Sequence, residues 1–301
     1  MNQDILALIQ ENMNTFSKGQ KRIAAFILES YDKAAFMTAS RLGKKVGVSE
    51  STVVRFAAEL GYDGYPDMQK SLQKMIRNRL TSVQRIEVTN DRIGDQDLVS
   101  MVLQSDMEKI RLTLEELDRD AFDHAVKAIV SAKRIYIIGV RSSAAIASFL
   151  GFYFNLIFDN VVNVTAGTAS EMFEHLLRVG EDDVVIGVSF PRYSKRTVKA
   201  IDYAKERGAT VIAITDSAGS PLAAKCDHLL LARSDMASFV DSLVAPLSLI
   251  NALIVAVGMR RQKEVGETYA QLEKIWDEYD VYDALQAAET KDNPSFCNTR
   301  C

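Results

Sequence analysis

The sequence has few of the residues on which metal centres and disulfide-linked domains depend. Its 301 residues include three cysteines and three histidines. The cysteines, Cys226, Cys297 and Cys301, show no metal-ligand spacing, and their odd number fits a reducing compartment. We therefore expect no metal site and a cytoplasmic protein.

Long apolar runs and cofactor motifs are also lacking. The first 17 residues predict an amphipathic helix with acidic residues, not the basic-then-apolar pattern of a secretion signal. The longest apolar stretch, residues 243–258, is interrupted by Pro246, Ser248 and Asn251. It is too short to cross a bilayer, so we interpret it as a buried helix and expect no membrane partner. Neither a G-x-G-x-x-G motif nor a Walker lysine motif is present, so no nucleotide cofactor is expected.

The charged residues are unevenly distributed along the chain. The whole sequence has 36 Lys and Arg and 40 Asp and Glu, a net charge of −4. Residues 1–80 contain 12 basic and 8 acidic residues, a net of +4, which leaves 24 basic and 32 acidic residues, a net of −8, for the remainder. The length favours two domains. A basic first domain on an acidic body is expected of a protein whose first domain meets phosphate groups.

Residues 38–62 predict two short helices joined by a tight turn. Thr38 and Ser49 suit the two helix N-termini, and Gly47 suits the end of the first helix. This is the layout of a helix-turn-helix, whose second helix enters the DNA major groove. An ordinary helical hairpin with a solvated polar face is the alternative. The residues expected to contact DNA are Lys44, Lys45, Ser49, Glu50, Ser51, Thr52 and Arg55.

Along the rest of the chain, the sequence pattern changes from helices alone to strands that alternate with helices. Helical spacing completes an all-helical first domain over residues 1–80, and the polar residues 81–96 predict a linker. From residue 97, two helices precede five apolar strands, expected at 135–139, 161–164, 183–189, 210–215 and 228–232 and alternating with helices. This order predicts a three-layer α/β/α sandwich with a five-stranded parallel sheet. Two closing helices are expected over residues 237–261 and 264–283, in a second domain of residues 97–285 followed by a disordered tail of residues 286–301.

Two loops at strand ends carry an unusual concentration of hydroxyl and basic groups. In a parallel sheet, ligands bind beyond the carboxyl ends of the strands, and each of these loops leads into a helix N-terminus that favours anions. Helix caps with solvated cations are the alternative for either loop taken alone. The first loop supplies Arg141, Ser142 and Ser143, and the second supplies Ser189, Arg192, Tyr193, Ser194, Lys195, Arg196 and Thr197. We expect these loops to hold an anionic ligand.

These stretches resemble a known family. The segment VGVSESTVVRFAAELGYDGYPDMQKSL, together with IYIIGVRSS and GVSFPRYSKRT, is similar to the RpiR/MurR family of bacterial transcription regulators. That resemblance implies a helix-turn-helix joined to a SIS (sugar isomerase) domain that binds phosphosugars. Ser194 and Thr197 match the phosphate ligands of the family's Ser-x-Ser-Gly-x-Thr loop. Arg192 and Lys195 replace its first Ser and its Gly, and Arg141 stands where a small residue is usual.

The resemblance implies a homo-oligomeric regulator, dimeric or tetrameric, that binds double-stranded operator DNA under the control of a phosphorylated sugar. The extra cations suggest a more anionic effector, such as a sugar-acid phosphate or a bisphosphate. The alternative is a sugar-phosphate isomerase with an appended DNA-binding domain. Glu171 stands where some SIS isomerases carry a basic Glu, with His175 four residues further on; without catalysis, we expect Glu171 to contact a sugar hydroxyl. A third possibility is an interaction module that has lost DNA binding.

Overall fold

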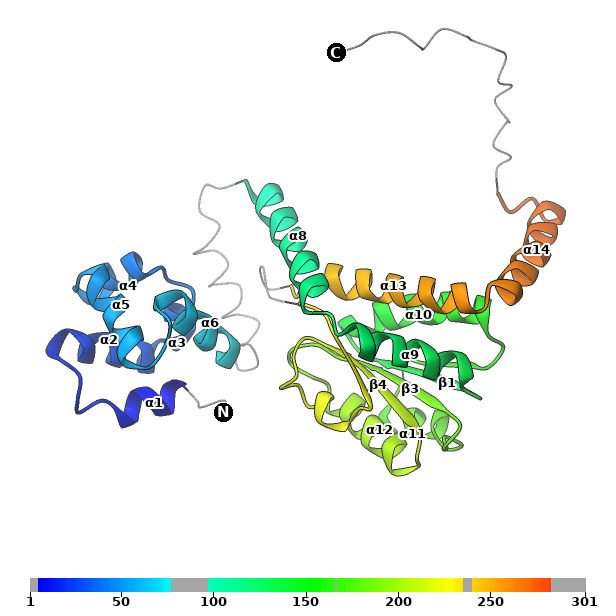
Figure 1. Ribbon diagram of the computed structural model, residues 1–301, viewed down its shortest axis with the longest axis horizontal. Coiled ribbons are helices and arrows are strands. Elements are labelled where there is room, and N and C mark those ends of the chain that lie inside the picture. The colour runs from blue at the N-terminus through cyan, green and yellow to red at the C-terminus, as the bar shows by residue number, and fades with distance from the viewer. Residues whose placement is uncertain (1–4, 77–96, 166, 235–239, 283–301) are drawn as a thin grey trace, which may run out of the picture.

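The computed structural model describes residues 5–76, 97–165, 167–234 and 240–282. The expected linker over residues 81–96, the expected tail over residues 286–301, Cys297 and Cys301 lie outside these ranges. The first domain is helical, and the second is an α/β sandwich (Figure 1). Each is described by itself below.

In the described part of the first domain, six helices pack around one apolar core. They are α1 (Ile5–Glu11), α2 (Lys18–Glu29), α3 (Tyr31–Ala34), α4 (Ala39–Val46), α5 (Glu50–Glu59) and α6 (Tyr65–Ile76). The helix-turn-helix is formed by α4 and α5. Phe56 and Leu42, both fully buried, anchor its two helices in the core. Tyr65 donates a 2.7 Å hydrogen bond to the carbonyl of Met37, just before α4, and burial raises its pKa to about 12.

The second domain is built on a five-stranded parallel sheet in the order β2-β1-β3-β4-β5. The strands are β1 (Ile135–Gly139), β2 (Val161–Val164), β3 (Val184–Val188), β4 (Thr210–Thr215) and β5 (His228–Leu231). Strands β1, β3 and β4 are almost wholly buried, as expected of apolar runs covered on both faces. The prediction of a five-stranded parallel sheet is therefore confirmed.

Helices cover both faces of the sheet (Figure 1). Helices α9 (Arg119–Ser131), α10 (Ser142–Ile157) and α13 (Val244–Arg260) pack on one face. Helices α11 (Ala169–His175) and α12 (Lys195–Glu206) pack on the other. A 3-10 turn, η1 (Ala223–Lys225), lies between β4 and β5. Helix α8 (Leu98–Glu116) packs on α13, and helix α14 (Gln262–Glu278) contacts α10 and α13.

The two closing helices differ from the predicted ranges. Helix α13 begins at Val244 rather than at residue 237, which places Pro246 in the first turn, where its missing N–H is not needed. Helix α14 ends at Glu278, and Asp280 then has φ 51°, so the chain leaves the helix before residue 283. In the part of the chain that the structure describes, no single helix is long and apolar enough to span a membrane, whereas α13 and α14, bent by 98°, meet that test only as a pair.

Candidate functional site

The helix-turn-helix begins both of its helices with hydroxyl caps, as predicted. The Thr38 Oγ1 accepts the Arg41 N–H at 3.2 Å at the start of α4. At the start of α5, the Ser49 Oγ accepts the Thr52 N–H at 3.3 Å. Gly47 ends α4 with φ 68° and ψ 46°, a left-handed conformation that glycine adopts without strain. The turn therefore has the local chemistry that the sequence pattern indicated.

The N-terminus of α5 presents a small polar surface. The Ser49 hydroxyl lies 2.9 Å from the Ser51 hydroxyl and 2.8 Å from that of Thr52. Arg55 is exposed, and its Nε donates to the Ser51 carbonyl one turn back at 3.4 Å. Its guanidinium is thus held along the helix toward the N-terminal turn. Glu50, Lys44 and Lys45 are exposed as well.

Arg22 is a cation of this surface that the sequence pattern did not single out. It projects from α2, and its guanidinium lies directly over Gly47, at the turn between α4 and α5. Arg22 is exposed, so its charge is available to a phosphate beside the turn. Nothing in the spacing of α2 signals this contact, because the contact joins residues 25 positions apart in the chain.

In the second domain, the two predicted anion loops begin side by side. Gly139 at the end of β1 is in register with Val188 at the end of β3. The chain order reverses at this point, because β2 lies on one side of β1 and β3 on the other. This is the topological switch point, where open α/β sheets bind ligands. The loops after β1 and β3 lead into α10 and α12.

The loop after β3 is closed by a chain of hydroxyl contacts. The buried Ser189 Oγ accepts the Ser194 N–H at 3.3 Å. The Ser194 Oγ then accepts the Thr197 N–H at 3.4 Å and so caps α12. Thr197 itself is fully buried, and its Oγ1 has no hydrogen-bond partner among the described residues. An anion can therefore reach this hydroxyl only if the residues that cover it move.

Both loops hold an arginine in an uncommon backbone conformation. Arg141 has φ 58° and Arg192 has φ 65°; Asp280 is the other described non-glycine residue with positive φ. Such conformations cost on the order of 1–3 kcal/mol and cluster at functional sites. Gly139, two residues before Arg141, is also constrained, because a Cβ there would lie 2.8 Å from the Ser143 carbonyl oxygen. Glycine would suit position 141, and arginine is held there against its backbone preference.

The charges of the two loops face solvent. Arg141, Arg192, Lys195 and Arg196 are all exposed, whereas Ser143 is buried and Ser142 exposed. Arg196 also donates from Nη1 to the Gly167 carbonyl at 3.2 Å, which ties the start of α12 to the loop after β2. Four cations, two helix N-termini and the Ser194 hydroxyl therefore lie along one edge of the sheet. The arrangement suits an anion.

A buried carboxylate borders this edge and was missed by the sequence analysis. Asp216 directly follows β4, and its Oδ1 accepts a 2.7 Å hydrogen bond from the Tyr193 Oη. This hydrogen bond holds the Tyr193 hydroxyl against the end of β4. The signal was present in the sequence, since Asp216 comes straight after an apolar strand on the ligand side of the sheet.

Glu171 has a structural partner. Its Oε2 accepts the Thr168 N–H at 2.5 Å, while its own N–H donates to the Thr168 Oγ1 at 3.2 Å. This reciprocal capping box begins α11. His175, on the same short helix, is exposed. The carboxylate is thus engaged at a helix start, as expected of a favourable N-terminal acid.

A cavity of about 370 Å³ lies at the opposite, amino edge of the sheet. Its lining includes Glu181, Asp182 and Asp183 beside Lys133. An anionic ligand would meet mainly negative charge there. The switch-point edge is therefore the better candidate site for an anion.

Comparison with known proteins agrees with this two-part organisation. Residues 3–79 match the helix-turn-helix domain of the rpiR family, and residues 128–256 match the SIS domain. The HTH-type transcriptional regulator HexR of Escherichia coli (strain K12) is 28% identical over 263 residues, which cover 86% of this chain and 89% of HexR. HexR of Pseudomonas aeruginosa is 25% identical over 265 residues, covering 86% of this chain and 90% of that protein.

Solved structures share the fold. The sugar isomerase domain of an RpiR transcription factor from Sphaerobacter thermophilus is 31% identical, covers 60% of this chain and 99% of its own, and has a TM-score of 0.57. The Vibrio vulnificus NanR protein, complexed with ManNAc-6P, covers 91% of this chain and 98% of its own, with 21% identity and a TM-score of 0.56. The chain belongs to the rpiR family of helix-turn-helix proteins, with a SIS domain as its second part.

Proposed function

We propose that this protein is a DNA-binding transcriptional regulator whose affinity for its operator is set by a phosphorylated sugar bound at the SIS domain. The observation that carries the proposal is the meeting of two cation-bearing loops and two helix N-termini at the switch point of the sheet, in a chain that also holds a helix-turn-helix. The curated relatives named above are transcriptional regulators.

The chemistry of the switch-point edge favours a strongly anionic effector. Helix N-termini and hydroxyl groups suit a phosphate, and Ser194 and Thr197 match the phosphate ligands of the family's loop. Arg141, Arg192 and Lys195 add charges beyond what one phosphate needs. NanR, which shares the fold, is described in complex with ManNAc-6P, a neutral-sugar monophosphate, so the preference for a more anionic effector rests on these three cations alone. We therefore propose a sugar-acid phosphate or a sugar bisphosphate in preference to a simple hexose monophosphate.

The DNA partner is proposed from the surface of α5. Its N-terminal hydroxyls and backbone N–H groups suit the major groove and an adjacent phosphate, and Arg55 suits a guanine edge. Helix-turn-helix proteins read two half-sites about 34–36 Å apart as dimers. We accordingly propose that the protein acts as a homo-oligomer, in the bacterial cytoplasm where the chromosome lies.

The proposed control is a shift between two arrangements of that oligomer. An effector changes DNA affinity only if it binds one arrangement more tightly than the other. Because Thr197 is fully buried, binding at its hydroxyl would require the residues that cover it to move. That movement is the proposed first step of the coupling.

We propose a sensing role for the SIS domain rather than catalysis. An aldose–ketose isomerase needs a free base to move a proton between neighbouring carbons. Glu171, the residue in the matching position, is engaged in the capping box of α11. Incubation with candidate sugar phosphates should leave the aldose unchanged. Formation of the ketose would favour the alternative, an isomerase with an appended DNA-binding domain.

The effector half of the proposal is tested by thermal shift. Sugar bisphosphates and sugar-acid phosphates should raise the melting temperature more than neutral-sugar monophosphates, and unphosphorylated sugars should not raise it, because only a ligand that prefers the folded state stabilises it. Equal shifts from a phosphosugar and its unphosphorylated parent would contradict a phosphate-binding role.

The DNA half is tested by gel shift against the DNA upstream of the protein's own gene. Arg55→Ala should weaken binding, with a loss confined to one base position if Arg55 reads a base edge. Lys263→Ala, which removes an exposed cation from α14, is the matched control and should bind as the wild type does. Equal affinities for the wild type and Arg55→Ala would remove α5 from the proposed interface.

A further inference from the structure

Helix α8 buries two polar residues and exposes a stripe of apolar ones. Lys109 and Thr113 on its inner side are only 4% and 8% exposed. A helix on the surface of a monomer normally shows the opposite arrangement. The outer side carries four exposed apolar residues, Leu103 (59%), Met107 (65%), Ile110 (37%) and Leu114 (59%).

The polar side is fastened to the segment that follows β5. The Thr113 Oγ1 accepts the Arg233 N–H at 2.9 Å, and the Ser242 hydroxyl donates to the Asp106 Oδ1 at 2.7 Å. The buried Lys109 ammonium lies 3.1 Å from the same Asp106 oxygen. Turning α8 to bury its apolar side would break these contacts. It would also leave the buried Lys109 ammonium without a partner, which is strongly destabilising. The outward stripe is therefore a fixed feature of the fold.

The stripe has the spacing of a two-helix seam. Steps of four, three and four residues separate Leu103, Met107, Ile110 and Leu114. That is the 3.5-residue period of coiled-coil a and d positions, continued over roughly 17 Å of helix at 1.5 Å per residue. Such a stripe is complementary to another helix with the same period.

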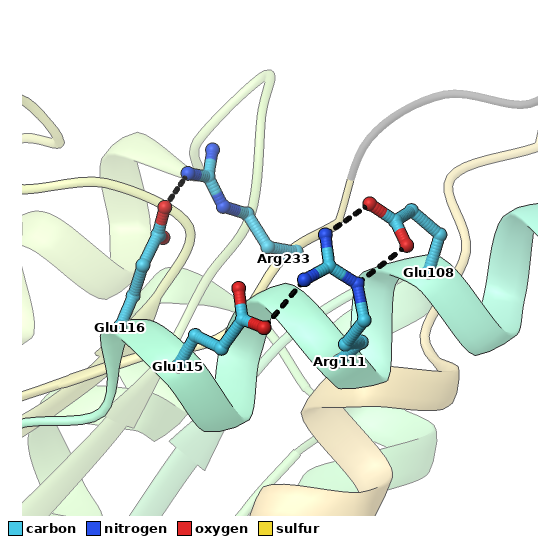
Figure 2. A network of polar contacts seen from close by, with 5 residues as sticks. All are labelled: Glu108, Arg111, Glu115, Glu116 and Arg233. Atoms are coloured by element: carbon cyan, nitrogen blue, oxygen red, sulfur yellow. Dashed lines mark hydrogen bonds and ion pairs between the residues drawn. The ribbon is translucent and has the colours of Figure 1, made fainter.

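The charged residues beside the apolar stripe indicate which kind of partner packs against α8. Figure 2 shows Arg111 held between Glu108 and Glu115 on α8, with its Nη2 at 2.6 Å from the Glu108 Oε1. Glu116, near the C-terminal end of the helix, pairs with Arg233 instead. Glu108 and Glu115 give this side of α8 an excess of negative charge, which disfavours DNA or an anionic membrane surface, while Arg111 offers a second copy a cation to set against its carboxylates. An edge with both signs can pair with a copy of itself across a two-fold axis.

We propose that the stripe Leu103, Met107, Ile110 and Leu114 packs against the same stripe of a second copy of this chain. The proposal deepens the proposed homo-oligomer by assigning its seam to α8. Helix α8 is the first described helix after the helix-turn-helix domain. A seam between two α8 helices would therefore limit how far apart the α5 helices of the two copies can lie. Its fastening to Arg233 and Ser242 also connects the seam to the chain that leaves the carboxyl end of β5.

The seam is tested by sedimentation velocity on the full chain, without DNA or sugar phosphate. The double variant Met107→Glu/Leu114→Glu should have half the mass of the wild type, with an unchanged circular dichroism spectrum. Leu177→Glu is the matched control, because Leu177 is 64% exposed and follows α11 on the far face of the sheet. It should keep the wild-type mass. A monomeric wild type, or a folded double variant of wild-type mass, overturns the proposal.

A cross-linking experiment decides the question if the double variant does not fold. Cysteines are placed singly at positions 103, 107, 110 and 114 in a Cys226→Ser/Cys297→Ser/Cys301→Ser background and treated with a short bismaleimide. At least one of the four should give a covalent dimer, and Leu177→Cys should not. No dimer from any of the four overturns the seam. A monomeric wild type would also contradict the proposed homo-oligomer, whereas an oligomeric wild type without cross-links overturns the seam alone. Neither experiment uses operator or effector, so DNA binding and sugar-phosphate binding are judged by their own tests.

Discussion

Replacing Thr197 with valine removes the buried hydroxyl that we propose binds the phosphate of the effector. Thr197 is fully buried in the first turn of α12, and its Oγ1 has no hydrogen-bond partner among the described residues. Valine has almost the same shape, so the helix and its packing should be retained. The variant therefore removes one polar atom and little else.

The expected effects on stability and on binding have opposite signs. A buried hydroxyl without a partner costs roughly 1–3 kcal/mol, so Thr197→Val should raise the free energy of unfolding by about 1 kcal/mol. For a domain of this size that corresponds to about 2–4 °C in melting temperature. A hydrogen bond to a charged phosphate contributes about 1.5–3 kcal/mol, so affinity for the effector should fall roughly 10- to 150-fold.

Urea unfolding and calorimetric titration with a sugar phosphate measure the two effects. Thr215→Val is the matched control, because Thr215 is equally buried but its Oγ1 donates to the Asp216 Oδ1 at 3.4 Å. That variant should lose about 1 kcal/mol. If Thr197→Val loses stability as Thr215→Val does, the Thr197 hydroxyl has a partner in the folded chain. Unchanged affinity would show that the hydroxyl is not a phosphate ligand.

Three further variants test other parts of the structure. Arg141→Gly should gain roughly 1 kcal/mol in urea unfolding, because glycine adopts positive φ without strain, and should bind sugar phosphates more weakly; a loss of stability would contradict the strain argument. Tyr65→Phe should lose about 1 kcal/mol in the melting of the first domain, because the hydrogen bond to Met37 disappears; an unchanged melting temperature would show that this bond contributes nothing. Burial lowers the pKa of His228, so the unfolded chain binds more protons below about pH 6.5 and stability should fall as the pH drops. Unfolding of His228→Asn between pH 7.5 and 5.5 should show a shallower decline, and an identical decline would assign the effect to other groups.

Local patterns in the sequence were enough to predict the helix-turn-helix and the sheet. The caps Thr38 and Ser49 and the left-handed Gly47 act within a few residues of themselves, so short-range chemistry determines them. The five apolar strands alternate with helices, and that order leaves few choices besides a parallel sheet with two covered faces. The switch-point edge followed from the same rule.

Contacts between distant parts of the chain decided the rest. The placement of Arg22 over Gly47, the bond from Tyr193 to Asp216 and the burial of the Thr197 hydroxyl each join or cover residues that sequence spacing does not relate. The exposed side of α8 is the clearest case, because the apolar spacing of this helix fits packing either on its own domain or on a second subunit.

The sequence by itself determined which elements form and at which edge of the sheet the two cation-bearing loops lie, because propensity, capping and strand order are local or topological properties. Only the tertiary structure decided which side of α8 faces solvent and which loop residues adopt positive φ. Those outcomes depend on the summed contacts of segments far apart in the chain, and no short stretch of sequence contains that sum.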